Sequence, residues 1–118
     1  MAITFRNEIN DSNVKITCAV HFGSGRCKHT SELTFGQSDS IKWGLLGHGD
    51  DKAHDVLVKV NISSGLDAHP YLSGVYDGNT IVVKEDKSKP DGTEKTFVCN
   101  LTATHHYESH RGYYIQKA

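Results

Sequence analysis

The segment that most constrains the fold is VKITCAVHF, residues 14–22, because apolar and polar residues alternate along most of its length. Successive side chains of a β-strand point to opposite faces of the sheet, so a period of two predicts a strand with one buried face. Shorter alternating runs recur at 3–5, 33–35, 41–45, 56–62, 81–83, 97–103 and 113–115. No long run shows the 3.6-residue period of an amphipathic helix. The sequence therefore predicts a series of short strands.

Turn-forming residues separate these runs, as at Gly23-Ser24-Gly25 and Asp77-Gly78-Asn79. Gly, Asn and Asp tolerate positive φ or close on their own backbone, which favours tight turns. Strands with one apolar face and no helix to cover it must bury those faces against one another. We therefore expect an all-β fold, a two-sheet antiparallel β-sandwich of about eight short strands, formed by residues 1–118 as a single domain. A closed barrel is the alternative, since periodicity does not distinguish the two.

Charge and hydropathy exclude several classes of function. The formal net charge is −1 and the basic residues are dispersed, which argues against a nucleic-acid partner, because phosphate binding needs clustered Lys and Arg. No segment approaches the roughly 20 apolar residues of a membrane span, and MAITFRNEIN lacks the pattern of a secretory signal. We therefore expect no transmembrane segment and a cytoplasmic location, with any release following an unconventional route.

The three cysteines form an odd set without metal-type spacing, which favours reduced thiols. Cys18 and Cys99 fall on apolar strand faces, where a thiol is a small core side chain. Cys27 follows a glycine-rich turn and is the only thiol expected to be reactive.

Histidine-rich segments raise two further hypotheses, metal binding and catalysis by paired imidazoles. His48 and His54 match no standard metal spacing, and the H-E-x-x-H pattern is absent. Eight histidines supply many acid–base pairs by chance, and no phosphate-binding motif accompanies them. We therefore expect a non-enzymatic protein with no catalytic residue, no metal site and no cofactor.

Polar and aromatic residues in the connections fit carbohydrate recognition, which needs hydrogen-bonding groups beside an aromatic face. Trp43 alternates with Ile41 and Leu45, so a core position is favoured over an exposed stacking platform. In the C-terminal HHYESHRGYY, residues 112–116 are expected to form the closing strand and 105–111 a polar turn with His110 and Arg111 at its tip. The candidate ligand-binding residues are Asp50, Asp51, His54, Tyr71, Tyr76, Asp77, Asn79, His110, Arg111 and Tyr114.

The arrangement ITFRNEINDSNVKITCAVHFGSG followed by LTFGQSDSIKWG resembles the opening of small β-sandwich proteins of the aegerolysin, actinoporin-like and fungal fruit-body lectin type. The shared features are an asparagine on or after the first strand (Asn7 or Asn10), a Ser-Gly turn at 23–25 and a glycine turn at Gly36. The resemblance implies a cytosolic, cofactor-free sandwich that binds glycans or membrane lipids. The chain lacks the dense Trp and Tyr cluster and the N-terminal amphipathic helix of actinoporins, which argues against pore formation.

Together these observations predict a lectin-like binding module that uses loops at one end of the sandwich. The alternative is a lipid-directed, membrane-binding or cytolytic protein, in effect a toxin, with a lipid headgroup as partner in place of a glycan. Edge strands of a small sandwich also invite pairing between copies, so a homodimer is a further expectation.

Overall fold

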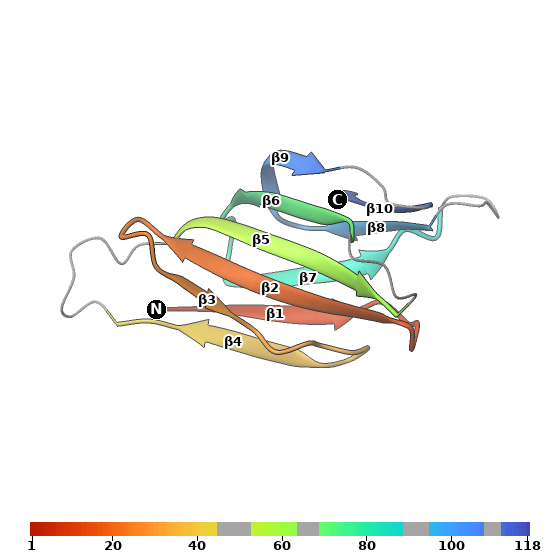
Figure 1. The fold of residues 1–118 in the computed structure, drawn as a ribbon, viewed down its shortest axis with the longest axis horizontal. Helices are drawn as coiled ribbons and strands as arrows, with labels where there is room; N and C mark the ends of the chain where they lie inside the picture. The colour runs from red at the N-terminus through yellow and green to blue at the C-terminus, as the bar shows by residue number, and fades with distance from the viewer. Residues whose placement is uncertain (45–52, 64–68, 89–94, 108–111) are drawn as a thin grey trace.

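The computed structural model describes residues 1–44, 53–63, 69–88, 95–107 and 112–118, which form ten strands and no helix (Figure 1). The strands are β1 (Ala2–Glu8), β2 (Val14–Phe22), β3 (Cys27–His29), β4 (Ser38–Lys42), β5 (Ala53–Ile62), β6 (Tyr71–Val75), β7 (Thr80–Glu85), β8 (Lys95–Cys99), β9 (Thr102–Tyr107) and β10 (Tyr113–Lys117).

Two five-stranded sheets face each other, one in the order β10-β8-β7-β1-β4 and the other in the order β3-β2-β5-β6-β9. The predicted all-β, two-sheet sandwich is therefore confirmed, and the closed-barrel alternative is excluded. Among the described strands six pairings are antiparallel. The pairings of β1 with β7 and of β8 with β10 are parallel, which the expectation of a purely antiparallel sandwich did not include.

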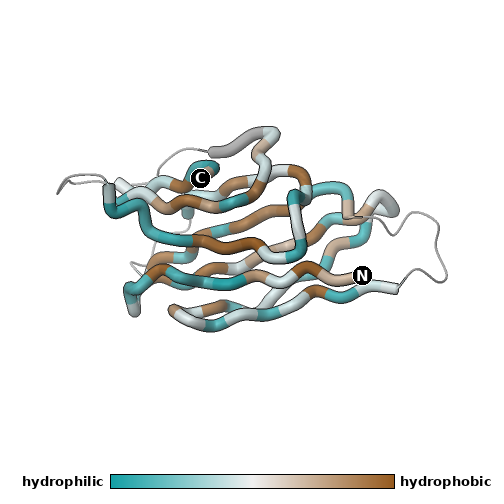
Figure 2. The backbone as a smooth tube through the Cα atoms, turned by 180° about the vertical axis from the view of Figure 1, so that it is seen from behind, coloured by the Kyte–Doolittle hydropathy of each residue, from teal (hydrophilic) through white to brown (hydrophobic). Residues whose placement is uncertain are grey.

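The core lies between the sheets and follows from the alternation in the strands. On β2 the side chains of Val14, Ile16, Cys18, Val20 and Phe22 are buried, as the period of two predicted. Apolar and polar segments alternate along the strands in the same way in Figure 2. Trp43 is only 7% exposed and meets Phe22 edge-to-face, with ring centroids 5.4 Å apart, so its predicted core position is confirmed.

The run 97–103, predicted as one strand, is two strands in different sheets. Cys99 ends β8, and β9 begins at Thr102. Between them the Asn100 side chain accepts a hydrogen bond from the Val82 amide (2.8 Å) and donates one to the Thr80 carbonyl (3.0 Å). The Asn100 backbone amide also donates to the Val82 carbonyl at 3.4 Å, so Asn100 makes the last contacts with β7 before the chain crosses to the other sheet.

Three other expectations differ from the structure. Residues 33–35 form no strand: Leu33 makes an isolated bridge to Ile16, and Phe35 is 54% exposed. β9 continues to Tyr107, so residues 105–107 are strand rather than part of the predicted polar turn, and residues 108–111 of that turn lie outside the described residues. β3 and β6 were not predicted, because β3 is short and polar and three successive residues of β6 are buried, which hides any alternation.

Strand directions place the connections at two ends of the sandwich. One end holds the start of β1, the end of β4, the β2–β3 turn, the start of β5 and the β6–β7 turn, at the left of Figure 1. We call this the Trp43 end, because Trp43 directly follows β4 there. The opposite end holds the β1–β2 turn, the end of β5 and the starts of β6, β8 and β10.

Candidate functional site

The β6–β7 turn at the Trp43 end brings together three of the predicted ligand-binding residues: Tyr76, Asp77 and Asn79. The turn carries the chain from one sheet to the other in four residues, and Gly78 adopts φ 131° within it, a conformation that L side chains rarely adopt. The Asn79 carbonyl accepts a hydrogen bond from the Thr4 amide at 2.9 Å, which fixes the turn to β1.

Side-chain contacts organise this turn further. The Tyr76 hydroxyl donates a hydrogen bond to Asn79 Oδ1 at 2.5 Å, and the Tyr76 ring packs partly buried against the core. The amide group of Asn79 therefore keeps its two N–H donors for another partner. Asp77 is exposed, and no described residue forms a hydrogen bond or ion pair with its carboxylate. The turn thus presents an aromatic ring, an acceptor and a donor side by side.

The remaining candidates are divided between the two ends. His54 is the second residue of β5 and lies exposed at the Trp43 end, as the turn does. Tyr71 begins β6 opposite Lys59, and Tyr114 lies on β10 opposite Thr96, which places both tyrosines toward the opposite end. Asp50, Asp51, His110 and Arg111 lie outside the described residues.

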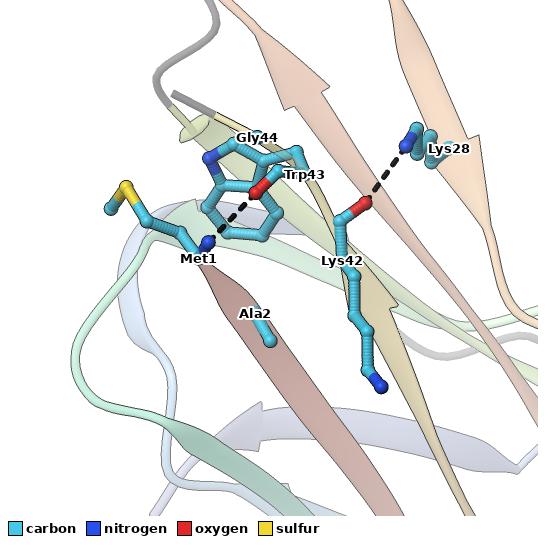
Figure 3. A pocket seen from close by; sticks show the side chains of 6 residues that line it. All are labelled: Met1, Ala2, Lys28, Lys42, Trp43 and Gly44. Carbon is cyan, nitrogen blue, oxygen red and sulfur yellow. Dashed lines mark hydrogen bonds between the residues drawn. The ribbon is translucent and has the colours of Figure 1, made fainter. Parts of the chain in front are cut away.

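A hollow of about 620 Å³ opens beside Trp43 at the same end (Figure 3). Two backbone carbonyls along it are held by cationic groups: the Met1 ammonium donates to the Trp43 carbonyl (2.7 Å), and Lys28 Nζ donates to the Lys42 carbonyl (2.8 Å). The lining residues that the structure describes include two lysines and no acid, so the electrostatic potential of this lining favours an electron-rich ligand. Its lining residues are Met1, Ala2, Lys28, Lys42, Trp43 and Gly44.

The indole nitrogen of Trp43 is buried and has no hydrogen-bond partner in the part of the chain that the structure describes. Buried indole N–H groups usually find an acceptor, because an unsatisfied one costs about 1–3 kcal/mol. The sequence reasoning missed the hollow, since its lining comes from three separate segments of the chain. The one sequence feature that pointed to the hollow was Trp43 itself, which stands next to Gly44 at the end of an alternating run.

Two of the thiols have no chemical role at this site. Cys18 and Cys99 are fully buried in the core. Burial raises the pKa of the Cys99 thiol to about 11 and raises that of Cys18 as well, so both stay protonated near neutral pH. Among the described residues, no three His, Cys, Asp or Glu side chains are grouped closely enough to hold a metal ion.

The chain was compared with models of protein families, with curated proteins and with solved structures, and none of the three comparisons found a match. The turn-pattern resemblance of the first 45 residues stays a prediction. Nowhere in the described residues does a helix have the length and apolar character needed to cross a bilayer.

Proposed function

We propose that this protein is a non-enzymatic, lectin-like module that binds carbohydrate at the Trp43 end. The observation that carries the proposal is the β6–β7 turn, where a partly buried tyrosine ring bonded to Asn79 is followed by Asp77, whose exposed carboxylate has no partner among the described residues. A sugar hydroxyl is both donor and acceptor. An ionised carboxylate accepts and an amide N–H donates, so the two side chains together match a pair of neighbouring hydroxyls.

The Tyr76 ring supplies the apolar part of such a site. The faces of sugar rings carry C–H groups that pack on aromatic surfaces, and tyrosine offers a rigid ring with only two side-chain torsions. The hydrogen bond from Tyr76 to Asn79 and the backbone bond from Thr4 to the turn hold these groups before any ligand arrives. Preorganisation of this kind lowers the entropy lost on binding.

The hollow beside Trp43 is close enough to extend the site. Ala2 lines the hollow, and Thr4 holds the turn two residues further along β1, which is about 7 Å along a strand. β4 borders one side of β1 and β7 the other. A glycan of more than one unit could therefore contact the turn with one residue and the lysine-lined hollow with the next.

A glycan array probed with the wild-type protein, followed by titration of the best ligand, tests the proposal. Asp77→Asn should weaken binding about tenfold or more, because it removes a charge-assisted hydrogen-bond acceptor. Glu32→Gln is the matched control, since Glu32 is an exposed carboxylate near the opposite end, where it pairs with Lys15 at 3.5 Å. Failure of the folded wild-type protein to bind any glycan would contradict the proposal.

A second candidate function, lipid-directed membrane binding, is favoured by one observation at the opposite end. Phe35 is 54% exposed in a turn held by hydrogen bonds from Gly36 N to the Asn7 carbonyl (2.8 Å) and from Thr34 N to Gln37 Oε1 (2.9 Å). A rigid turn that presents an aromatic side chain suits insertion at a bilayer interface. Co-sedimentation with liposomes tests it: Phe35→Ser should abolish sedimentation, whereas no sedimentation of the wild type with any headgroup composition removes this candidate.

The proposal includes a cytoplasmic location and a homodimer. The three free cysteines support a reducing compartment. β3 and β4 end their sheets in the described part of the chain, so their outer backbone edges are available for pairing with a second copy. Two copies would double the sites and raise avidity for clustered glycans. Light scattering decides this part, because a strict monomer at working concentration contradicts the dimer but not glycan binding.

A further inference from the structure

Cys27 and His29 form a thiol–imidazole pair on the surface, outside the proposed glycan site. They are the first and last residues of β3, and Cys27 Sγ lies 3.4 Å from His29 Nε2. Residues two apart on a strand point to the same face, which explains why the two side chains meet. This contact arises only because residues 27–29 are a strand, which the sequence did not predict.

The pair faces away from the core on an edge of the sandwich. Cys27 lies opposite His21 on β2, and His21 alternates with the buried Val20 and Phe22, so this row of side chains is on the outer face. β3 is the last strand of its sheet. His29 is exposed and Cys27 is partly exposed, so a small molecule can approach the sulfur from solvent.

The other two thiols provide an internal contrast. Cys18 and Cys99 are 0% exposed, and burial raises the pKa of each. Neither can meet a reagent while the protein is folded. The thiolate is the nucleophilic form of cysteine, so a partly exposed thiol in contact with an imidazole nitrogen differs from both buried thiols in access and in chemistry.

We propose that Cys27 is a site of thiol–disulfide exchange with low-molecular-weight peptide disulfides such as oxidised glutathione, and that His29 is the base that activates it. The Cys27 thiol transfers its proton to His29 Nε2, and Sγ attacks one sulfur of the disulfide. The bond between the two reagent sulfurs breaks as the new S–S bond forms. The departing thiolate takes up a proton, and Cys27 carries a mixed disulfide.

The charged neighbours of Cys27 lie on different sides of β3. Arg26 and Lys28 flank it in the chain; the Arg26 guanidinium lies 5.9 Å from the centre of the Phe22 ring, and Lys28 reaches the Lys42 carbonyl. In the β2–β5 pairing Asp55 lies opposite His21, one strand further from Cys27, and its Oδ1 already accepts a hydrogen bond from the Val56 amide. Lys28 alternates with Cys27 along β3 and therefore points to the opposite face, whereas Asp55 lies in the same outer-face row as His21 and Cys27. The reaction therefore depends on the contact with His29 and on access to the sulfur rather than on charge.

The reaction is tested by stopped-flow mixing of the folded protein with the chromogenic disulfide DTNB. We expect one fast-reacting thiol in the native protein and all three thiols in denaturant. Cys27→Ser should remove the fast phase. His29→Gln should slow it about tenfold or more, because glutamine keeps a polar side chain but cannot take up the proton. Incubation with oxidised glutathione should add a single adduct, and peptide mass analysis should locate it on Cys27.

His21→Gln is the matched control for the role of His29. It removes an imidazole that lies directly across from Cys27 in the β2–β3 pairing, so it tests whether proximity alone is sufficient. We expect less than a twofold change in rate. Equal slowing by both histidine variants, or no slowing by His29→Gln, overturns the assignment of the base. If no thiol of the native protein reacts faster than the buried Cys18 and Cys99, the assignment of Cys27 as the exchange site is wrong. Circular dichroism spectra identify any variant that fails to fold.

Discussion

Asn7 is a polar residue at a core-facing position of β1, on the same face as Ile3 and Phe5, and its side chain is fully buried. Its Nδ2 donates to the Leu33 carbonyl at 2.8 Å, and its Oδ1 accepts from the Ile9 amide at 2.7 Å. Buried polar groups are tolerated only when their hydrogen bonds are satisfied. Asn7 thus fixes the segment before β4 against β1.

Replacement of Asn7 by alanine should lower the free energy of unfolding by about 2–3 kcal/mol, because the Ile9 amide would remain buried without its partner. The Leu33 carbonyl would lose one of its two donors and keep the Ile16 amide at 3.0 Å. Urea denaturation with an unchanged m-value measures the loss. Asn13→Ala is the control, since Asn13 is exposed and its side chain forms no hydrogen bond with the described residues. We expect it to change stability by less than about 0.5 kcal/mol. Equal effects of the two substitutions would contradict this role of Asn7.

At the scale of elements, the alternation identified strands with one buried face and missed those without it. β2 and β5 are long and alternate along most of their length, so their limits could be approximated from the sequence. In β6, Leu72, Ser73 and Gly74 are buried in succession, because β9 and β5 flank the strand closely and the pairing with β9 shifts register after Ser73. A buried, irregular strand gives no period for a sequence to reveal.

Gly74 sets the spacing between β6 and β9. A methyl group at this position would overlap the carbonyl oxygen of Thr102 and the Cα atom of Ala103, which are backbone atoms that cannot move independently. Gly74→Ala should therefore destabilise the protein by about 2 kcal/mol or more, measured by thermal or urea unfolding. Val75→Ala on the same strand, at a position 41% exposed, should cost less than about 1 kcal/mol. A Gly74→Ala protein as stable as the wild type would show that the two strands are not packed this closely.

An ion pair joins two other elements, the β1–β2 turn and the start of β8. Lys95 Nζ lies 2.6 Å from Asp11 Oδ2, with the Lys95 and Asp11 side chains 41% and 21% exposed. The hydrogen bond from Lys95, together with the Asn13 amide, lowers the pKa of Asp11 below its ordinary value of 3.8. The same contact raises the pKa of Lys95 above 10.5.

A group with a lowered folded-state pKa stabilises the protein above its unfolded pKa and loses that effect as the pH falls through the folded value. Asp11→Asn should therefore cost less than about 1 kcal/mol at neutral pH, because solvent screens the pair. The difference from wild type should shrink as the pH falls below 3.8. For Lys95 the sign is opposite, so its contribution should fade only as the pH rises beyond 10.5. Urea denaturation across this range measures both, and a difference independent of pH would contradict the assignment.

At the scale of the whole molecule, the two parallel pairings connect distant parts of the chain. β1 pairs with β7, and β8 pairs with β10, so neither pair can form from a simple hairpin. One continuous core spans both sheets and includes Trp43. Closing such distant segments is entropically costly, and domains with mostly non-local pairings fold slowly.

The fluorescence of Trp43, the single tryptophan, reports on the unfolding of this core and on its rate of refolding. Its fluorescence should be blue-shifted in the native state because the indole is buried, and its red shift on unfolding should coincide with the loss of far-UV circular dichroism, as a two-state transition requires. Refolding after dilution from urea should take milliseconds to seconds. If the tryptophan signal changed well before the circular dichroism, the Trp43 end would unfold separately from the rest of the sandwich.

The sequence by itself determined the fold class, the inward-facing residues of β1, β2, β5 and β7, and the burial of Trp43 and of two thiols. Alternation is a local property, and it reports which face of a strand is apolar. The order of the strands, the parallel pairings and the division of 97–103 between two sheets were decided only by the tertiary structure, because periodicity does not specify a pairing partner.

The same distinction applies to the sites. Sequence reasoning named Tyr76, Asp77 and Asn79, since they are neighbours in one turn, but it combined them with Tyr71 and Tyr114, which the strand directions place toward the other end. It could not find the hollow beside Trp43, whose walls come from separate strands, or the contact between Cys27 and His29, which needs the extended conformation of β3. Side-chain chemistry is encoded residue by residue, whereas proximity depends on how the strands pair.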